Sequence, residues 1–170
     1  MKISVTITKS NFNIIETLNK LNNTNADFLH LDVMDGLFVS NKLFPYDEVK
    51  EFIIHNKKPL DIHLMVIDVK KHVDEFVNIC PEYITFHLEV NDDINELIKY
   101  IHSYNIKVGI SIKPNTKIEE INKYLPYIEQ VLVMSVEPGL GGQKFIEEVL
   151  PKITLLKEIK QQNNYHYLIS

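Results

Sequence analysis

Two histidines and one aspartate stand where they could bind a metal ion. His30 and Asp32 are two residues apart in a run that reads as a strand, so their side chains point to the same face. His63 ends the next such run and can reach the same point. Imidazole nitrogens and a carboxylate oxygen suit Zn²⁺, Fe²⁺, Mn²⁺ or Co²⁺, and three ligands leave positions open for substrate oxygens. A polar cluster held only by hydrogen bonds explains His30 and Asp32 equally well, because His-x-Asp is common by chance.

A glycine-rich segment follows a later strand-like run. Gly139, Gly141 and Gly142 let the backbone approach a ligand closely, and the start of the next helix would aim free N–H groups at it. The sequence contains no Arg, so a phosphate would be held by Lys or by backbone N–H groups. A flexible turn is the alternative interpretation. A metal beside a phosphate at successive strand ends indicates an enzyme that acts on a sugar phosphate.

Other polar and sulfur-containing side chains also fall at strand ends. Met34, Met65 and Met134 are predicted either to fill gaps in the core or to form a polarizable lining around a reactive intermediate. His87 and Glu89 share one face of another run. Either residue could orient a ligand or a water, or the two could form a purely structural hydrogen-bonded pair.

Seven apolar runs alternate with helical patterns along the chain. The predicted strands are 3–8, 28–32, 60–65, 83–87, 107–112, 130–136 and 165–170, and the predicted helices are 11–21, 47–55, 69–79, 94–101, 118–124 and 145–160. Alternation of this kind predicts right-handed crossovers and a parallel α/β sheet. An open doubly wound sheet and a (β/α)₈ barrel both place ligands at the carboxyl ends of strands. Candidate residues at four or more strand ends favour the barrel.

Three residues are expected to define helix ends. Ser10 is a candidate N-cap of the first helix, and Asp68 is a candidate N-cap of the third. Pro151 lies within the last helical pattern, so that helix is expected to begin late or to kink there.

Composition narrows the function classes. The 170 residues predict a single domain, 1–170, and the net charge of −5 without a basic cluster argues against a nucleic-acid partner. Cys80 is the only cysteine, which excludes a disulfide framework and a cysteine-based zinc cluster. The chain shows neither a signal-peptide pattern nor a membrane-spanning stretch, so we expect no membrane partner and a cytoplasmic location.

The segments taken together closely resemble the ribulose-phosphate 3-epimerase family. The resemblance rests on HLDVMDGLFVSN at 30–41, DIHLMV at 61–66, FHLE at 86–89, GISIKPNT at 109–116 and VLVMSVEPGLGGQKF at 131–145. It implies a TIM (β/α)₈ barrel and a metal-dependent epimerase. The implied reaction converts D-ribulose 5-phosphate to D-xylulose 5-phosphate in the pentose phosphate pathway, by proton abstraction at carbon 3 through an enediolate.

The resemblance also implies roles for individual residues. Three residues match three of the family's four metal ligands, and Asp32 also matches one of its two acid/base residues. Thr6 occupies the place of a serine that contacts substrate, and His63 is expected near the substrate as well. The three methionines match those around the family's site. The metal ligands are His30, Asp32 and His63, and the substrate-phosphate loop is matched by Gly139, Leu140, Gly141 and Gly142.

One family motif has no counterpart in this sequence. The family's seventh strand ends in V-D-G-G, whose Asp is the fourth metal ligand and the second acid/base, whereas here the residues at 167–170 are YLIS. We therefore expect an incomplete barrel of about six βα units plus the start of strand seven. We also expect the 170-residue chain alone to be inactive or barely active. Glu89 and Glu137 are the nearest candidates for the second acid/base, without family support.

Two rival functions and one property of the assembly stay open. The first rival is an allulose-6-phosphate 3-epimerase, which acts on a six-carbon sugar phosphate. The second is a non-catalytic remnant that binds a sugar phosphate or a metal without turnover. The family often forms homo-oligomers, and the sequence leaves that open for this chain.

Overall fold

The structure is a computed structural model that describes residues 2–7 and 13–170. In the part described, one curved sheet carries seven parallel strands that pair in chain order. They are β1 (Ser4–Thr6), β2 (Phe28–Asp35), β4 (Leu60–Met65), β5 (Tyr83–His87), β6 (Lys107–Ile112), β7 (Gln130–Val133) and β8 (Leu168–Ile169). A doubly wound sheet would reverse its strand order, whereas this sheet does not. The strand order therefore confirms the barrel type, here as an incomplete barrel with β1 and β8 at the two ends of the sheet.

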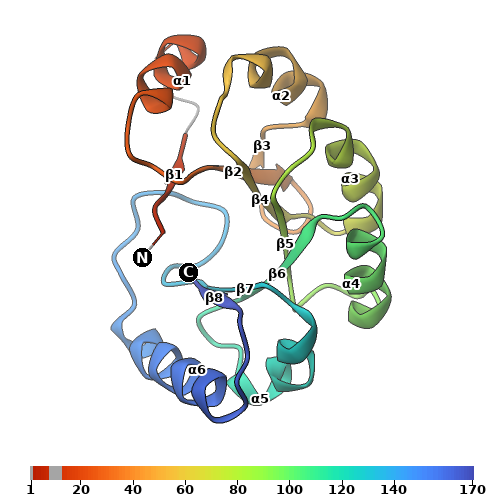
Figure 1. Cartoon of the computed structure of the whole chain (residues 1–170), viewed down its shortest axis with the longest axis vertical. Coiled ribbons are helices and arrows are strands. Elements are labelled where there is room, and N and C mark those ends of the chain that lie inside the picture. The colour runs from red at the N-terminus through yellow and green to blue at the C-terminus, as the bar shows by residue number, and fades with distance from the viewer. Residues whose placement is uncertain (1, 8–12) are drawn as a thin grey trace.

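Helices lie outside the curve of the sheet (Figure 1). They are α1 (Ile14–Asn22), α2 (Tyr46–Phe52), α3 (Val69–Phe76), α4 (Ile94–His102), α5 (Ile118–Ile121) and α6 (Leu150–Gln162). Short 3₁₀ turns extend α2, α3 and α5 and precede α6; they are η1 (Ile53–His55), η2 (Val77–Ile79), η3 (Asn122–Tyr127) and η4 (Glu147–Val149). Each helix returns the chain to the start of the next parallel strand.

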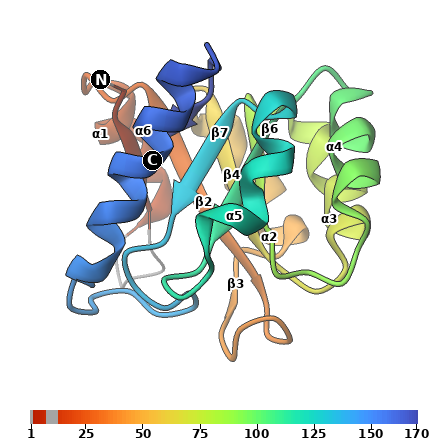
Figure 2. The ribbon, with the colours of Figure 1, turned by 90° about the horizontal axis from the view of Figure 1, so that it is seen from below.

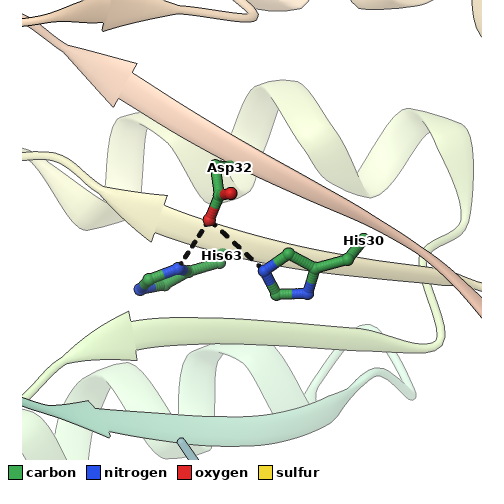
Figure 3. Close-up of side chains that lie close together, drawn as sticks. All are labelled: His30, Asp32 and His63. Atoms are coloured by element: carbon green, nitrogen blue, oxygen red, sulfur yellow. Dashed lines mark hydrogen bonds and ion pairs between the residues drawn. The ribbon is translucent and has the colours of Figure 1, made fainter. Parts of the chain in front are cut away.

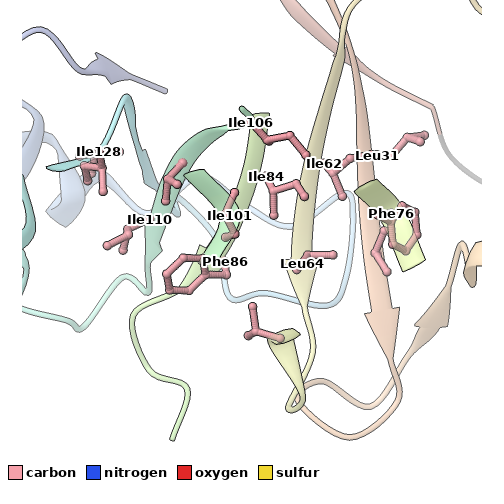
Figure 4. Close-up of a cluster of buried hydrophobic side chains, with 14 of the residues drawn as sticks. Leu31, Ile62, Leu64, Phe76, Ile84, Phe86, Ile101, Ile106, Ile110 and Ile128 are labelled. Carbon is pink, nitrogen blue, oxygen red and sulfur yellow. The ribbon is translucent and has the colours of Figure 1, made fainter. Parts of the chain in front are cut away.

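The hydrophobic core lies between the sheet and these helices. Leu31, Ile62, Ile84 and Ile110 are fully buried in it, as Figure 4 shows for a cluster that includes them. Side chains alternate between the two faces of a strand, so the residues next to these positions face the inside of the curve. That inner face is polar along β2, β4 and β5, and it carries the candidate site.

Helix ends follow local capping chemistry. The Asn13 side chain accepts hydrogen bonds from the backbone N–H groups of the first turn of α1, so Asn13 is the N-cap of the helix as the structure describes it. The predicted cap, Ser10, lies outside the described residues. Asp68 caps α3 as predicted, by accepting from the N–H of Lys71. The last helix begins late, as predicted, with Pro151 in its first turn.

The sequence did not predict β3 (Lys42–Leu43), which pairs antiparallel with the end of β2. The turn after β2 is held by Asp35, whose carboxylate accepts from the N–H groups of Leu37 and Phe38 and from the N–H of Ile67 beyond β4. The extension from β2 to β3 and the loop between β7 and α6 lie at the same end of the sheet, where the parallel strands finish (Figure 2). TIM barrels carry their active sites at this end.

Candidate metal and substrate site

Three side chains from neighbouring strands meet on the inner face of the sheet. The register pairs Asp32 of β2 with His63 of β4, and His30 of β2 with Asp61 of β4. His30 and Asp32 face inward together because they are two residues apart. One potential ligand atom from each of His30, Asp32 and His63 lies within 4.8 Å of the other two. Figure 3 shows both imidazole rings directed at the carboxylate.

One nitrogen of each imidazole ring lies close to the same carboxylate oxygen. Asp32 Oδ1 lies 2.9 Å from His63 Nδ1 and 3.3 Å from His30 Nε2. The His63 side chain is 1% exposed, and the Asp32 side chain keeps 24% of its surface accessible. The centre is therefore sheltered by the sheet, and Asp32 keeps it in contact with solvent.

The close pairing shifts the pKa values of His30 and Asp32 in opposite directions. Burial alone would lower the pKa of His30, but hydrogen bonds and attraction from Asp32 and Asp61 raise it to about 10. Burial alone would raise the pKa of Asp32, but contacts with His30 and His63 hold it well below its ordinary range. Asp32 is thus ionised at neutral pH, and its negative charge favours the binding of a cation at the cluster.

The second ring nitrogen of His30 is held by an aspartate that sequence reasoning did not single out. His30 Nδ1 lies 2.7 Å from Asp61 Oδ2, and the Ser4 hydroxyl donates to the same oxygen over 3.0 Å. Asp61 is 3% exposed, and its Oδ1 has no hydrogen-bond partner among the described residues. Its position two residues before His63 places it on the same inner face, and this spacing was the signal available in the sequence.

The other side of His63 connects to His87 and Glu89, so the structure joins these two candidates to the cluster. His63 Nε2 lies 3.0 Å from His87 Nε2, and His87 Nδ1 lies 3.1 Å from Glu89 Oε2. Glu89 Oε1 accepts from the N–H of Lys113 over 2.9 Å and from the hydroxyl of Thr116. The pair is hydrogen-bonded, as one reading of the sequence predicted, and it also touches a candidate ligand.

Their pKa values follow from these contacts. Burial lowers the pKa of His87 to about 4, although Glu89 opposes the shift. Burial alone would raise the pKa of Glu89, but hydrogen bonds from His87, Lys113 and Thr116 lower it to about 2. At neutral pH this pair is therefore a neutral imidazole beside a carboxylate.

The remaining side chains predicted around the site lie at the same ends of their strands. Met34 and Met65 are register partners two positions beyond Asp32 and His63, and they are 8% and 2% exposed. Met134 directly follows β7 and is half-buried. Thr6 is the last residue of β1; it pairs with His30 and is exposed.

The loop between β7 and α6 is fastened to the loop between β2 and β3. Gly139 is buried with φ +106°, and a Cβ at this position would lie 2.8 Å from Val39 Cβ. The Asn41 side chain donates to the Gly139 carbonyl over 2.6 Å. The Gln143 side chain donates to the carbonyls of Glu137 and Leu140 over 2.6 Å and 2.8 Å, and so closes the loop on itself. Gly139 is therefore required by the fold whether or not a ligand binds.

The tip of this loop differs from Gly139. Leu140 is 60% exposed, and an added Cβ at Gly141 or Gly142 would meet nothing within 4 Å. The expected helix start beside the glycines is wrong, because residues 143–146 separate them from η4 and α6 begins only at Leu150. Any phosphate held at this tip would depend on the N–H groups of the loop itself.

The donor set fits a divalent metal ion. Two imidazole nitrogens and one carboxylate oxygen form a combination that Zn²⁺, Fe²⁺, Mn²⁺ and Co²⁺ accept. Two aromatic nitrogens facing one anionic oxygen also need a cation or a proton between them. Within residues 2–7 and 13–170, this is the group of three or more His, Cys, Asp or Glu side chains found close enough to share an ion.

In the same residues, no helix has the length and apolar character needed to cross a bilayer.

The fold and this cluster define a TIM-type α/β barrel with a candidate metal centre at the carboxyl ends of its strands. Among solved structures, the N-terminal domain of a proposed aldolase from Bacteroides vulgatus is similar in fold, with a TM-score of 0.57 over 93% of this chain and 56% of that one, at 17% identity. The ribulose-phosphate 3 epimerase family model matches residues 2–170. The chain belongs to the ribulose-phosphate 3-epimerase family.

Curated relatives agree with this assignment. The ribulose-phosphate 3-epimerase of Treponema pallidum is 37% identical over 145 residues, which cover 85% of this chain and 66% of the relative. The Aquifex aeolicus enzyme is 37% identical, with 85% and 65% of the two chains covered. A rice ribulose-phosphate 3-epimerase, named a cytoplasmic isoform, is 36% identical over 92% of this chain and 71% of its own. The chain thus spans about two thirds of the length of these relatives.

Proposed function

We propose that the chain supplies the metal centre and one acid/base group for epimerisation of D-ribulose 5-phosphate at carbon 3, which gives D-xylulose 5-phosphate in the pentose phosphate pathway. The observation that carries this proposal is the meeting of His30, Asp32 and His63 at one point in a member of this family. The curated relatives are named for this reaction.

Asp32 is the residue that exchanges the carbon-3 proton in this proposal. Its carboxylate is ionised, partly accessible and held in place by two imidazoles. Removal of the proton leaves an enediolate, and return of a proton to the opposite face inverts the centre. His30 and His63, with Asp32, would hold a divalent ion such as Zn²⁺, Fe²⁺, Mn²⁺ or Co²⁺, which supplies positive charge to stabilise the negative oxygens of the enediolate.

The surrounding residues would bind and shield the substrate. Backbone N–H groups of Gly139, Leu140, Gly141 and Gly142 are proposed to hold the phosphate, because the loop tip has open space where a ligand could approach. Thr6 would offer its hydroxyl to a substrate oxygen, and His63 would lie beside the reacting end. The sulfur-containing side chains of Met34, Met65 and Met134 would keep water away from the reacting carbon.

A second acid/base is needed on the opposite face of the sugar. Glu89 is unsuited to this role, because both of its oxygens already accept hydrogen bonds from His87, Lys113 and Thr116. Glu137 is exposed on the β7–α6 loop. In the described residues the metal cluster contains one carboxylate. We therefore propose that these 170 residues alone exchange the proton but invert the centre poorly.

Deuterium exchange tests this proposal directly. The metal-loaded chain in D₂O is expected to place deuterium on carbon 3 of D-ribulose 5-phosphate while forming little D-xylulose 5-phosphate, as followed by NMR. Asp32→Asn is the matched control and should abolish the exchange. Exchange that persists in Asp32→Asn, or normal inversion by the 170-residue chain, would contradict the proposed roles. The same assay on D-allulose 6-phosphate tests the six-carbon preference, and binding without exchange identifies a non-catalytic protein.

We also propose a cytoplasmic location, which the name of the rice relative supports. A small-molecule sugar phosphate is the proposed partner, and homo-oligomerisation, common in the family, is proposed as a property to test by light scattering.

A further inference from the structure

A hydrogen-bonded chain leads from the metal cluster across the inner face of the sheet. It runs from His63 of β4 to His87 of β5 and ends at Glu89, just beyond β5. We propose that Glu89 is a positioning residue that acts through His87 to fix the tautomer of His63, so that His63 Nδ1 presents a lone pair to a divalent cation. The inference rests on the metal centre of the proposed function and assigns that centre a control element outside its ligands.

The direction of each hydrogen bond follows from the Glu89 end. Its Oε1 accepts from the backbone N–H of Lys113, which can only donate, and from the Thr116 hydroxyl. A carboxylate is an acceptor at both oxygens, so His87 Nδ1 must be the N–H that donates to Oε2 over 3.1 Å. A neutral His87 then has a bare Nε2.

The same reasoning passes to the next ring. The two Nε2 atoms of His87 and His63 lie 3.0 Å apart and can share only one proton. Because His87 Nε2 is the acceptor, His63 Nε2 is the donor. A His63 ring with a single proton therefore carries it on Nε2 and leaves Nδ1 bare, and Nδ1 faces Asp32 Oδ1 at 2.9 Å.

Without the hydrogen bonds through His87 and Glu89, the other tautomer of His63 would be favoured. A proton on its Nδ1 could donate to the Asp32 carboxylate, and that proton would occupy the nitrogen that a metal needs. Both His63 and His87 are buried, at 1% and 0% exposed, so water cannot readily replace the missing partner on Nε2. Protein groups that hold the second nitrogen of a metal-binding histidine typically change metal affinity 10–100-fold when they are removed.

Ring ¹⁵N NMR on the zinc-loaded chain tests the tautomers without any use of activity. The expected result is a proton on Nε2 of His63 and a proton on Nδ1 of His87. A proton on His63 Nδ1, or on His87 Nε2, would overturn the proposal. Failure of the chain to bind Zn²⁺ at these residues would overturn it as well.

Glu89→Gln is the informative variant, because it keeps the size and the acceptor toward Lys113 but turns an N–H₂ group toward His87. This group donates where the carboxylate accepted. The donor and acceptor in each hydrogen bond from residue 89 through His87 to His63 are therefore exchanged, and the proton of His63 moves to Nδ1. Zinc affinity, measured by competition with a chromophoric chelator, is expected to fall about 10–100-fold. An unchanged affinity would overturn the proposal.

Glu129→Gln is the matched control. Glu129 also accepts from a histidine, His102, over 3.1 Å and from a backbone N–H, that of Val108, over 2.8 Å. Among the described residues, its side chain hydrogen-bonds His102 and Val108 and none of the cluster, so zinc affinity should stay unchanged. An equal loss of zinc affinity in this variant would show that removal of any such negative charge weakens zinc binding, and it would overturn the proposed action of Glu89 through His87.

A double-mutant cycle separates action through His87 from direct electrostatics. In a His87→Leu background, Glu89→Gln should have no further effect on zinc affinity. If Glu89→Gln lowers zinc affinity in the His87→Leu background as much as it does in the wild type, Glu89 does not act through His87 and the proposal is overturned. If the tautomers and zinc affinities are as expected but the protein turns over no sugar phosphate, the role of Glu89 stands and the proposed reaction fails. If proton exchange is normal but the tautomers are the opposite ones, the proposed reaction stands and the role of Glu89 fails.

Discussion

At the scale of single residues, the chemistry depends on one carboxylate that faces two imidazole nitrogens. Asp32 Oδ1 is the shared point, and each ring has its second nitrogen held by a further side chain, Asp61 for His30 and His87 for His63. The rings are thereby fixed in orientation before any ligand arrives. Preorganised ligands of this kind reduce the cost of ordering a site on binding.

Replacement of the shared carboxylate tests this arrangement. Asp32→Asn should reduce affinity for Zn²⁺ or Mn²⁺ by at least about 100-fold, because an amide supplies neither the charge nor an equally good ligand oxygen. The fold should persist, since Asp32 lies on the inner face and the apolar core lies on the other side of the sheet. Titration calorimetry with circular dichroism checks both outcomes; a retained affinity would contradict the ligand assignment.

Metal binding should release protons at neutral pH. In the metal-free chain the pKa of His30 is about 10, so the ring carries an extra proton at pH 7. A metal ligand must be deprotonated, so about one proton should leave as the ion binds, and the apparent affinity should rise with pH below that pKa. Calorimetry in buffers of different ionisation enthalpy measures the number released. Zero proton release at pH 7 would conflict with His30 as a ligand.

At the scale of elements, the β7–α6 loop divides into a part needed for folding and a part free to bind. Gly139 meets Val39 closely at a positive φ, and Asn41 holds its carbonyl. Gly141 has open space around it. The three glycines of this loop therefore answer to different requirements, although the sequence presents them as one motif.

A matched pair of alanine substitutions separates these requirements. Gly139→Ala should lower the free energy of unfolding by about 1–3 kcal/mol, because the new Cβ clashes with Val39 and the backbone is strained. Gly141→Ala should leave stability within about 0.5 kcal/mol, since an exposed site without contacts tolerates a methyl group. Urea unfolding followed by circular dichroism measures both; equal losses would refute the division.

The same pair also tests the phosphate assignment. If the loop tip closes on a phosphate, Gly141→Ala should weaken binding of D-ribulose 5-phosphate several-fold while the metal affinity stays the same. Calorimetric titration of the sugar phosphate into the metal-loaded chain provides the measurement. Unaltered binding would remove Gly141 from the proposed phosphate contacts.

At the scale of the whole molecule, sequential strand order brings inner-facing polar residues of successive strands together on one face of the curved sheet. The network from Ser4 on β1 to Thr116 after β6 spans five strands; the Ser4 hydroxyl reaches past β2 to Asp61 on β4, and the later links join neighbouring strands or residues at one strand end. It couples the ionisation of the interior to the stability of the barrel as a whole.

The stability of the metal-free chain should therefore peak near neutral pH. The pKa of His87 is lowered to about 4, so its contribution is present above pH 6.5 and is lost as pH falls from there toward 4. The lowered pKa of Glu89, about 2, extends the acid loss below pH 4.5. The raised pKa of His30, about 10, gives stability that is full below pH 6.5 and is lost as pH rises through 10.

Thermal melting of the metal-free chain between pH 4 and 10 measures this profile. His87→Gln should flatten the decline between pH 6.5 and 4 while leaving the alkaline decline in place. A profile that keeps its full acid slope in His87→Gln would show that other groups control it.

Sequence reasoning alone predicted the alternation of strands and helices, the barrel type and the set His30, Asp32 and His63. The alternation follows from periodicity, and the shared face of His30 and Asp32 follows from their spacing along one strand. The barrel type and the role of the three residues as a set rested on candidate residues at several strand ends and on the family resemblance. Three features emerged only from the three-dimensional structure: Asp61 and Glu89 join the hydrogen-bonded network around that set, β3 forms, and Gly139 packs against Val39. These contacts join residues from different strands and loops, so they depend on register and on the curvature of the sheet, which local sequence does not specify.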